Sequence, residues 1–399
     1  MKQIAKKMGY LLFAFFFYMN RIFTRVNKHK VFCIMTHDSS MDSNVGMIIQ
    51  EMKKQDANYK FYYIKKEETA EVKNGGKVRS MLSFFLVKPF HMATAGYIFL
   101  DNTFLPMAYL RFSSKAKVVQ LWHGTGTIKK FGQDANEGDL KKLENHANRT
   151  ITHLIVNAEE IREQYAGAFG VEFDKVYATG LPRTDVLFDR EKKKVDRANF
   201  YNQYPELKHK KLVLYAPTFR DNEVANPKME LDLDTFINEL PEDTVCMIKL
   251  HPFVARQYAW TKEQEERYKD RVVNLSSYAD ITTLLFVADV LITDYSSIIY
   301  EYCLREKPMI FFAYDLETFE RSGRGFYEPY EESVPGMVVR TTEEVVEAIK
   351  LNLYEGKYDH ERIEWFRDKY YQYFDGKSTE RVIKLVMEYY FRKNGEVIF

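Results

Sequence analysis

The residue best placed for acid–base chemistry in this sequence is His123, which follows the short apolar run of residues 118–121. A buried strand over that run puts the imidazole at the carboxyl end of the strand, where α/β sheets bind their ligands. Gly124 and Gly126 let the backbone approach a ligand closely and offer free N–H groups. Because imidazole titrates near neutral pH, the pattern predicts that His123 acts as a general base. The alternative is a packing histidine beside a structural tryptophan, Trp122.

A second polar strand end lies at residues 248–252. Lys249 and His251 follow an apolar run there, and Pro252 prevents the strand from continuing. Two basic side chains at such a place suit the oxygens of a phosphate group. The alternative is an ordinary exposed strand end.

A third polar strand end lies at residues 291–297, which read as strand, turn and helix start. Ser296 and Ser297 are residue types that cap helices, and a helix start offers free N–H groups and a favourable dipole. Together these features predict a cradle for a diphosphate. Glu301 falls one turn into the helix, where its carboxylate could accept a hydrogen bond from a sugar or alditol hydroxyl. Plain helix capping is the alternative explanation of this pattern.

Weaker signals come from Arg183 and Thr218, which also follow strand-like runs. His37 follows the first predicted strand and is a further candidate. The pair Asp232 and Asp234 resembles a metal-binding DxD pattern, but it lies in an acidic helical stretch, so no metal site is predicted. The sequence has no GxSxG, GxGxxG or Walker pattern, which argues against serine-hydrolase, dinucleotide and P-loop chemistry.

These motifs require strands that end at one edge of a sheet, and the apolar runs supply them. Short buried runs separated by helical stretches are typical of parallel sheets covered on both faces. Strands are predicted at residues 31–35, 61–64, 97–100, 118–121 and 154–156 in the first half, and at 212–215, 245–248, 272–274, 290–292 and 309–312 in the second. Helical spacing follows at residues 342–353 and 378–391. The sequence thus predicts two doubly wound α/β domains whose motifs face a shared cleft.

The length of 399 residues is enough for two domains, since single hydrophobic cores stop growing near about 250–300 residues. We predict a helical segment at residues 1–30 and domains at residues 31–195 and 196–399. The net charge of +1 argues against a nucleic-acid partner. Three cysteines in apolar contexts, without metal-ligand spacing, indicate reduced core residues: Cys33, Cys246 and Cys303.

The N-terminal segment combines basic residues with an aromatic run at residues 10–18. The run is shorter than the about 20 apolar residues that a membrane-spanning helix needs, and no small-residue cleavage site follows it. A basic-flanked aromatic helix is typical of an interfacial anchor on an anionic membrane surface. We therefore predict an amphipathic, membrane-associating helix. A helix packed on the protein's own surface and an uncleaved membrane span are the alternatives.

Five motifs stand in a fixed order at strand ends: residues 122–125, 180–183, 216–218, 249–252 and 293–297. In these motifs the chain resembles the CDP-glycerol glycerophosphotransferase family, the teichoic-acid primases and polymerases of Gram-positive bacteria. Each motif alone is modest, but five in order are specific. The resemblance implies a GT-B-like fold, in which two Rossmann-like domains face a central cleft. Residues 31–195 would form the acceptor domain and residues 196–399 the domain that binds the CDP donor.

The resemblance also implies roles for single residues. His123 would be the base on the acceptor hydroxyl, and His251 would stabilise the phosphoryl group in flight. The substrate site would be lined by Trp122, Gly124, Thr125, Gly126, Arg183, Pro217, Thr218, Lys249, Leu250, Ser296, Ser297 and Glu301. Two departures stand out: Gly126 replaces a proline that the family often has, and Glu301 stands where an acid of either length occurs.

The implied reaction transfers glycerol phosphate from CDP-glycerol to a hydroxyl of a lipid-linked acceptor and releases CMP. The acceptor would be an undecaprenyl-diphosphate disaccharide in wall teichoic acid synthesis. A catalytic module that fills nearly the whole chain favours a primase or short-chain transferase. The enzyme would be peripheral (monotopic) at the cytoplasmic face of the cell membrane. No cofactor is predicted, and the metal requirement and the oligomeric state, a homo-oligomer included, are left open.

Three alternative functions stay open at this point. A CDP-ribitol-dependent ribitolphosphotransferase would use the same motifs. A GT-B glycosyltransferase with a nucleotide sugar would use the same cleft and diphosphate cradle. A membrane-bound binding or scaffold protein with a decayed site is the alternative from another class, and the intact His123, His251 and Ser296 argue against it.

Overall fold

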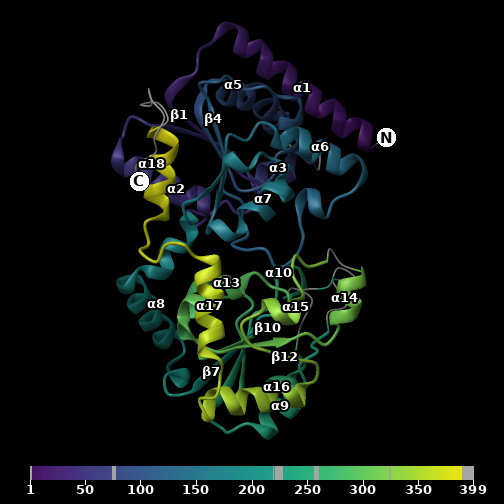
Figure 1. Cartoon of the computed structure of the whole chain (residues 1–399), viewed down its shortest axis with the longest axis vertical. Helices are drawn as coiled ribbons and strands as arrows, with labels where there is room; N and C mark the ends of the chain where they lie inside the picture. The colour runs from purple at the N-terminus through teal and green to yellow at the C-terminus, as the bar shows by residue number, and fades with distance from the viewer. Residues whose placement is uncertain are drawn as a thin grey trace. The chain divides into compact units, whose positions relative to one another are not determined.

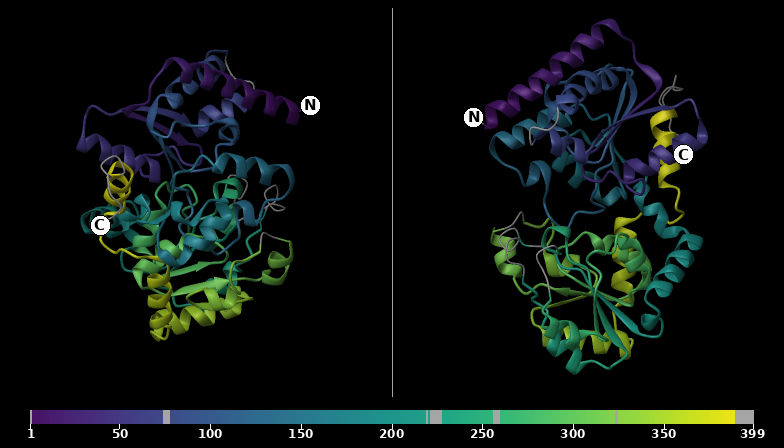
Figure 2. Two further views of the ribbon diagram at one scale, coloured as in Figure 1. Left: turned by 45° about the horizontal axis from the view of Figure 1, so that its top comes forward. Right: turned by 180° about the vertical axis from the view of Figure 1, so that it is seen from behind.

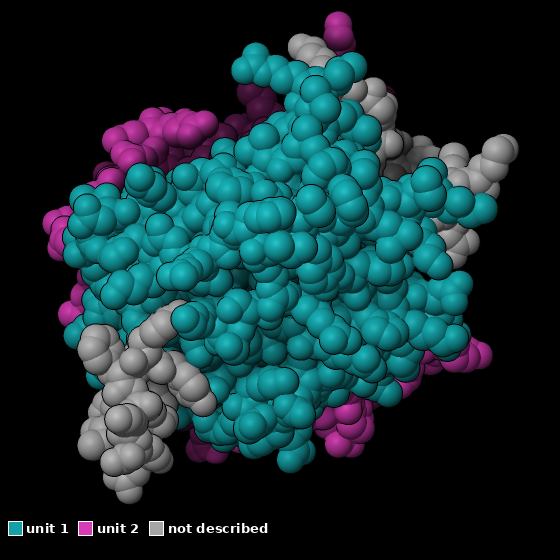
Figure 3. Space-filling view, turned by 90° about the horizontal axis from the view of Figure 1, so that it is seen from above, with its two compact units in different colours: residues 1–125, 130–188, 371–399 teal, residues 126–129, 189–370 magenta. Residues whose placement is uncertain are grey.

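The computed structural model describes residues 2–73, 78–218, 220, 228–255, 260–322 and 325–388. The chain forms two compact units, coloured separately in Figure 3. Unit 1 comprises residues 1–125, 130–188 and 371–399, and unit 2 comprises residues 126–129 and 189–370. The division differs from the predicted domains at three places. Residues 126–129, predicted in the first domain, belong to unit 2. The predicted boundary after residue 195 falls inside α8 (Arg190–Gln203), and the C-terminal tail groups with unit 1.

Unit 1 is built on a sheet of six parallel strands in the order β2-β1-β3-β4-β5-β6. Its strands are β1 (Asn27–Met35), β2 (Lys60–Lys65), β3 (Ala95–Leu100), β4 (Lys117–Gln120), β5 (His153–Val156) and β6 (Val176–Ala178). Its helices are α1 (Lys2–Phe23), α2 (Asn44–Gln55), α3 (Lys66–Lys73), α4 (Val78–Leu82), α5 (Lys88–Ala93), α6 (Gly138–Asn148), α7 (Arg162–Phe169) and α18 (Ser378–Glu388).

The strands of unit 1 are apolar on both sides because helices cover both faces of the sheet. On one face Cys33 and Met35 of β1 pack with α2 and α18, which lie side by side (Figure 1). On the other face Phe32 and Ile34 pack with α1 and α5. The single strand β1 therefore contributes alternate residues to two cores, as its period of two requires.

Unit 2 repeats the design with a parallel sheet in the order β12-β11-β10-β7-β8-β9. Its strands are β7 (Lys211–Tyr215), β8 (Thr244–Ile248), β9 (Val272–Asn274), β10 (Val290–Thr293), β11 (Met309–Phe312) and β12 (Met337–Val339). Its helices are α8, α9 (Leu233–Glu239), α10 (Pro252–Ala255), α11 (Lys262–Tyr268), α12 (Ile281–Val287), α13 (Ile298–Tyr302), α14 (Leu316–Ser322), α15 (Tyr330–Ser333), α16 (Thr342–Ile349) and α17 (His360–Tyr370). The helices α9 and α16 share a core with one face of the sheet, and α12 contacts β7 and α8.

All ten predicted strands are present, with ends shifted by a few residues. The strands β6 and β12, each of three residues at the edge of its sheet, were not predicted. The helix predicted at residues 342–353 is α-helical to Ile349 and continues as a π-helical turn, Lys350–Tyr354. The helix predicted at residues 378–391 is α18, and residues 389–391 lie outside the described part. The three cysteines are buried and free, as predicted.

The tail is fastened to unit 1 by one buried carboxylate, that of Asp185. It accepts hydrogen bonds from the backbone N–H groups of Ser378 and Thr379, both at 2.8 Å, and from the Thr379 hydroxyl at 2.7 Å. The first N–H groups of a helix have no partner within the helix, so Asp185 caps α18 from a distant part of the chain. This contact, together with the packing of α18 on α2, holds the tail on unit 1.

The N-terminal segment forms one helix, α1, that packs on unit 1 along one side (Figures 1 and 2). Phe13 and Phe17 are fully buried, the first against Phe84 and Phe104 and the second against Phe112. Packing on the protein's own surface, one of the alternatives, is thus present. Within the described part of the chain, no helix is long and apolar enough to cross a membrane.

Candidate active site

The register of the unit 1 sheet brings several polar strand ends to one edge. Ile34 pairs with Leu100, Leu100 with Gln120, and Gln120 with Leu154. The residues that follow β1, β3 and β4 therefore leave the sheet side by side. This places the loop after β1, the segment after β3 and His123 in one neighbourhood.

His123 is preceded by a residue in a strained backbone conformation. Trp122 has a φ of 55°, a left-handed value that is rare for a bulky residue and costs about 1–3 kcal/mol. Its N–H donates to the side-chain oxygen of Gln120 at 2.9 Å, and its carbonyl accepts from the side-chain amide of Asn44 at 3.0 Å. The indole packs between Phe131 and Phe169. These contacts fix the turn that aims the next residue, His123.

The tautomer of His123 follows from its hydrogen bond. Its Nδ1 lies 3.0 Å from the backbone carbonyl oxygen of Asp101, which can only accept. Nδ1 therefore carries the proton in the neutral ring, and Nε2 keeps its lone pair. That is the form a general base requires.

The surroundings of His123 favour its neutral form. Burial lowers the pKa of His123 to about 3, with further lowering from the neighbouring His37 and from Arg183 and an opposing contribution from the Asp101 hydrogen bond. At neutral pH the imidazole is therefore able to accept a proton. A bound anion would stabilise the protonated ring and raise this pKa, which is the direction that proton acceptance needs.

Arg183 is tied to the same turn. Its backbone N–H donates to the Asn44 side-chain oxygen at 2.9 Å, and its guanidinium donates to the carbonyl oxygen of His123 at 3.3 Å. Asn44 thus holds two loops at once, since its amide also binds Trp122. The structure brings Arg183 and His123 together, as their predicted roles require.

The residues after His123 are packed more tightly than a ligand-facing glycine turn predicts. The carbonyl of Gly124 accepts from the Tyr165 hydroxyl at 2.8 Å, and Thr125 is buried. Gly126 belongs to unit 2, where a Cβ atom at this position would come within 2.2 Å of the Tyr300 ring. The Tyr300 hydroxyl also accepts from the Thr127 N–H at 3.0 Å. The described structure therefore requires glycine at 126 for packing.

Replacing Gly126 by alanine should destabilise unit 2. The ring of Tyr300 is fully buried and stacks on Phe366, so it has little room to move. Overpacking of this kind typically costs about 1–3 kcal/mol, which calorimetry would register as a lower melting temperature. The matched control is Gly9→Ala in α1, where a Cβ atom would meet Phe85 at an ordinary 3.7 Å. Equal melting temperatures for both variants would contradict the assignment.

The sheet of unit 2 also brings its motifs to one edge. Ile292 pairs with Tyr215, and Tyr215 with Ile248, so the segments after β7, β8 and β10 leave together. The buried carboxylate of Asp294 joins two of them, because it accepts from the N–H groups of Thr218 at 2.8 Å and Tyr295 at 2.7 Å. The hydroxyl oxygen of Thr218 is buried and has no partner among the described atoms. A donor or acceptor left open at a strand end is a plausible ligand contact.

Arg220 completes this edge. Its guanidinium binds Asp294 at 3.0 Å and Asp315 through two bonds of 2.8 Å, and it also donates to the Thr218 carbonyl at 2.7 Å. Burial alone would lower the pKa of Arg220, but the two carboxylates raise it above its ordinary value. The cation stays charged and locks the Thr218 segment to the end of β10.

The second predicted motif follows β8 and contains Lys249, Leu250 and His251. The Lys249 ammonium donates to the carbonyls of Ser276 at 3.1 Å and Tyr278 at 2.5 Å, and burial lowers its pKa. Leu250 lies in the hydrophobic core. His251 is half-buried directly before α10.

The predicted diphosphate cradle is smaller than expected. The helix α13 has five residues, and Ser297 makes no side-chain capping bond. Instead the Ser296 hydroxyl oxygen accepts from the Ile298 N–H at 3.3 Å. Ser297 is exposed and Glu301 is buried. The conformation of the backbone after β10 is therefore held by the Asp294 carboxylate more than by helix capping.

The described residues include no group of three or more His, Cys, Asp or Glu side chains arranged to hold a metal ion. Asp232, one half of the DxD pattern, caps α9 by accepting from the Asp234 N–H at 2.9 Å. This local role accounts for the pattern.

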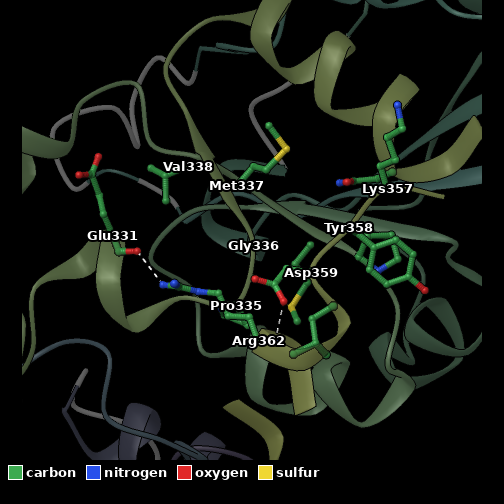
Figure 4. A pocket seen from close by; sticks show the side chains of 13 residues that line it. Glu331, Pro335, Gly336, Met337, Val338, Lys357, Tyr358, Asp359 and Arg362 are labelled. Carbon is green, nitrogen blue, oxygen red and sulfur yellow. Dashed lines mark hydrogen bonds between the residues drawn. The ribbon is translucent and has the colours of Figure 1, made fainter. Parts of the chain in front are cut away.

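A cavity of about 650 Å³ opens elsewhere in unit 2 (Figure 4). It lies at the amino ends of β11 and β12, beside the start of α17. Arg362 reaches across its wall to the Glu331 carbonyl at 2.9 Å, and its backbone N–H donates to Asp359. Its described lining contains none of the predicted site residues, and it lies at the other end of the strands from the edge that carries the motifs.

Sequence reasoning missed four residues that organise the two edges: Asn44, Asp101, Arg220 and Asp294. Asp101 directly follows a predicted strand and Asp294 comes two residues after one, so their position was a usable signal. Asn44 lies inside a helix start and Arg220 in an irregular segment, where no local pattern marks a residue that acts across the fold. His37, a weak candidate in the sequence, lies against His123.

Two units, each with a wrapped parallel sheet and polar motifs at the carboxyl edge, define a GT-B-like α/β protein. The solved structure of the wall teichoic acid polymerase TagF matches with a TM-score of 0.75 at 24% identity, over 91% of this chain and 89% of that one. The UDP-GlcNAc 2-epimerase of Methanocaldococcus jannaschii matches with a TM-score of 0.54 at 14% identity, over 90% of this chain and 99% of that one. Both likenesses concern the fold.

The sequence comparisons are more specific. A family model described as CDP-glycerol:poly(glycerophosphate) glycerophosphotransferase matches residues 15–388, so the chain belongs to this family. It is 36% identical to the teichoic acid poly(ribitol-phosphate) polymerase of Bacillus spizizenii, over 96% of this chain and 60% of that protein. It is 27% identical to the teichoic acid glycerol-phosphate primase of Bacillus subtilis, over 87% and 90%. The chain spans about three fifths of the length of the ribitol-phosphate polymerases that it matches.

Proposed function

We propose that this chain transfers an alditol-phosphate unit from a CDP-activated donor to a hydroxyl of a lipid-linked acceptor and releases CMP. The acceptor would be a lipid-linked disaccharide in wall teichoic acid synthesis. The observation that carries the proposal is the neutral His123 with its proton on Nδ1 and its lone pair on Nε2, in a member of this family. The named relatives are teichoic acid primases and polymerases.

In the proposed step the acceptor hydroxyl gives its proton to Nε2 of His123. Its oxygen attacks the phosphorus that carries the alditol, a new P–O bond forms, and the bond to the CMP oxygen breaks. Phosphoryl transfer of this kind relies on positioning and electrostatic stabilisation. Arg183, which is bound to the carbonyl of His123, supplies positive charge beside the base.

Unit 2 contributes the donor side of the proposal. His251 stabilises the phosphoryl oxygens, and Thr218, Ser296 and Ser297 bind the diphosphate. The buried, unpartnered Thr218 hydroxyl supports this assignment. Lys249 acts mainly through its bonds to Ser276 and Tyr278, which hold the strand end that carries His251.

Glycerol is the alditol that the family resemblance implied, and ribitol is the second candidate. Identity to the ribitol-phosphate polymerases is 34–36%, whereas identity to the glycerol-phosphate primase and polymerases is 27–30%. The difference supports testing both donors with equal weight.

The function is tested by incubating the purified chain with a lipid-linked disaccharide and CDP-glycerol, CDP-ribitol or UDP-N-acetylglucosamine. CMP release with a product heavier by one or more alditol-phosphate units is expected with one CDP donor. UDP release instead would favour a nucleotide-sugar glycosyltransferase. No turnover and no calorimetric binding of either CDP donor would contradict the proposal.

We further propose that α1 holds the enzyme on the inner surface of the cell membrane. One side of α1 packs on unit 1, while the opposite side exposes an apolar stripe with helical spacing: Ile4, Met8, Leu11, Phe15, Met19 and Ile22. Lys6, Lys7, Arg21 and Arg25 flank the stripe. A second exposed apolar set lies on the neighbouring segment of residues 78–90. An apolar stripe with basic flanks suits an anionic lipid surface.

The membrane contact is tested by the double variant Phe15→Ser/Ile22→Ser, since both side chains are more than half exposed. Deleting residues 1–30 would be a poor test, because it removes the core residues Phe13 and Phe17. Burial of such side chains is worth about 1.5–3 kcal/mol each, so binding to vesicles with anionic lipid should weaken at least about tenfold. The matched control is Leu140→Ser, an exposed leucine on α6. Unchanged vesicle binding by the double variant would contradict the assignment.

A further inference from the structure

The loop after β1 is fastened to the segment that orients His123. The carboxylate of Asp101 is buried and accepts from the backbone N–H groups of Thr36 at 3.0 Å, His37 at 3.2 Å and Asp38 at 3.0 Å. The backbone carbonyl of the same Asp101 accepts from Nδ1 of His123. One residue thus fixes both the loop and the base.

The loop carries a second imidazole to the first. The rings of His37 and His123 are stacked, with centroids 3.8 Å apart and planes inclined by 8°. The His123 ring also contacts the indole of Trp122, with centroids 3.9 Å apart and planes inclined by 32°. The base therefore contacts two aromatic rings, while its Nδ1 is held by Asp101. These contacts leave Nε2 as the unclaimed nitrogen of the neutral ring.

We propose that His37 is a positioning residue for the base: its ring, placed by Asp101, clamps His123 in the orientation that directs Nε2 at the acceptor hydroxyl. This inference deepens the proposed function and rests on it for the identity of the reaction. His37 needs no contact with substrate in this role, because it acts through His123.

The stack also has an electrostatic consequence. A proton on His37 would lie one ring distance from His123, and a like charge disfavours the protonated form of its neighbour. The charged and titratable groups around His123 are His37 from the loop after β1, Arg183 from the 182–188 segment, and Asp101 from the end of β3. Asp38 is close to Asp101. Burial raises the pKa of the Asp101 carboxyl to about 6, although hydrogen bonds from three backbone N–H groups oppose this shift. Of these, His37 and Arg183 lower the pKa of His123, so removing His37 raises it.

Two substitutions separate clamping from other roles. His37→Ala removes the ring, whereas His37→Phe keeps an aromatic ring of similar size that does not titrate. His37 is exposed to solvent, so neither change opens a core cavity. Since misplacing a catalytic group slightly costs up to about 10²-fold, we expect His37→Ala to lower kcat about tenfold or more with KM little changed. His37→Phe should restore at least half of the wild-type kcat.

A second readout needs no turnover. In protein labelled with ¹⁵N at histidine, the ring nitrogens of His123, assigned by their loss in His123→Gln, report tautomer and titration. We expect the Nδ1–H tautomer in wild type and His37→Phe, a mixture of tautomers in His37→Ala, and a higher pKa of His123 in His37→Phe than in wild type. This measurement can be made even if neither CDP donor is turned over. Failure of the proposed reaction is therefore distinguished from failure of the proposed role of His37.

Each outcome of these measurements either supports or overturns the proposed role of His37. Loss of kcat in His37→Ala, rescue in His37→Phe and the tautomer change support the clamp. A wild-type kcat and a single tautomer in His37→Ala overturn it. Loss of kcat in both variants also overturns it, because His37 would then act through its own nitrogen atoms.

Discussion

Replacing His123 by glutamine is expected to lower kcat by about 10²–10⁴-fold, the usual worth of a general base. Glutamine keeps a side chain of similar reach but has no group that accepts a proton near neutral pH. The loss should appear in kcat with both substrates saturating, because the base acts in the transition state and not in ground-state binding. Rapid-quench measurement of CMP release gives the rate of the chemical step directly.

The matched control for this loss is His153→Gln. His153 lies on β5 of the same sheet, is buried and packs against Tyr177, and burial lowers its pKa to about 4. It thus resembles His123 in environment but lies at the amino end of its strand, away from the motif edge. We expect a lower melting temperature with kcat retained. A His123→Gln enzyme within tenfold of wild type would remove His123 from the role of base.

Much of unit 1's site could be predicted because its residues follow buried strands. Parallel strands share one edge at their carboxyl ends, so a polar residue after an apolar run is a candidate by position alone. His123, Arg183 and His37 were found in this way. What the sequence did not contain is the pairing register, and the register decides that Asp101 and the loop after β1 meet His123.

The roles assigned to several motif residues could not be read from local pattern. Lys249 looks like a phosphate ligand in the sequence, but its ammonium is bound to two carbonyls from a loop 27 and 29 residues away. Gly126 looks like a ligand-facing glycine, but it makes room for Tyr300, 174 residues later in the chain. The family's proline would need the space that this tyrosine fills. In both cases the contact that determines the role joins residues far apart in the sequence, so the neighbouring residues do not predict it.

The strand patterns in the sequence predicted the two sheets more completely than they predicted the division into domains. Ten apolar runs of three to five residues were enough for two parallel sheets. The return of the tail to unit 1 depends on Asp185, whose carboxylate substitutes for a local helix cap at Ser378. Asp185 lies 193 positions before Ser378, so the helix sequence itself does not reveal this cap. The tail was therefore assigned to the second domain, which precedes it directly in the chain.

The largest loss of stability in unit 2 is expected from Arg220→Met. Methionine has a similar length but no charge, so it leaves the carboxylates of Asp294 and Asp315 partly or fully buried without their cation. Removing one member of a buried ion pair typically costs about 3–5 kcal/mol, because the remaining charge stays desolvated. The Tyr295 hydroxyl, 2.9 Å from Asp315, cannot replace a full positive charge. Calorimetry on wild type and variant should show the transition of unit 2 at a much lower temperature.

The control for this change is Arg340→Met, which removes an ion pair with the exposed Glu331. Exposed pairs contribute about 0–1 kcal/mol, so its melting temperature should stay near that of wild type. Burial opposes the charged form of Asp315, but Arg220 still lowers its pKa below the ordinary value. The stability from this pairing is therefore present at neutral pH and is lost as the pH falls through that lowered pKa. A small effect of Arg220→Met at neutral pH would mean that water reaches the pair, and Thr218 would then be held by Asp294 alone. A large effect would show that the same buried charges that hold unit 2 together also position its candidate donor contacts.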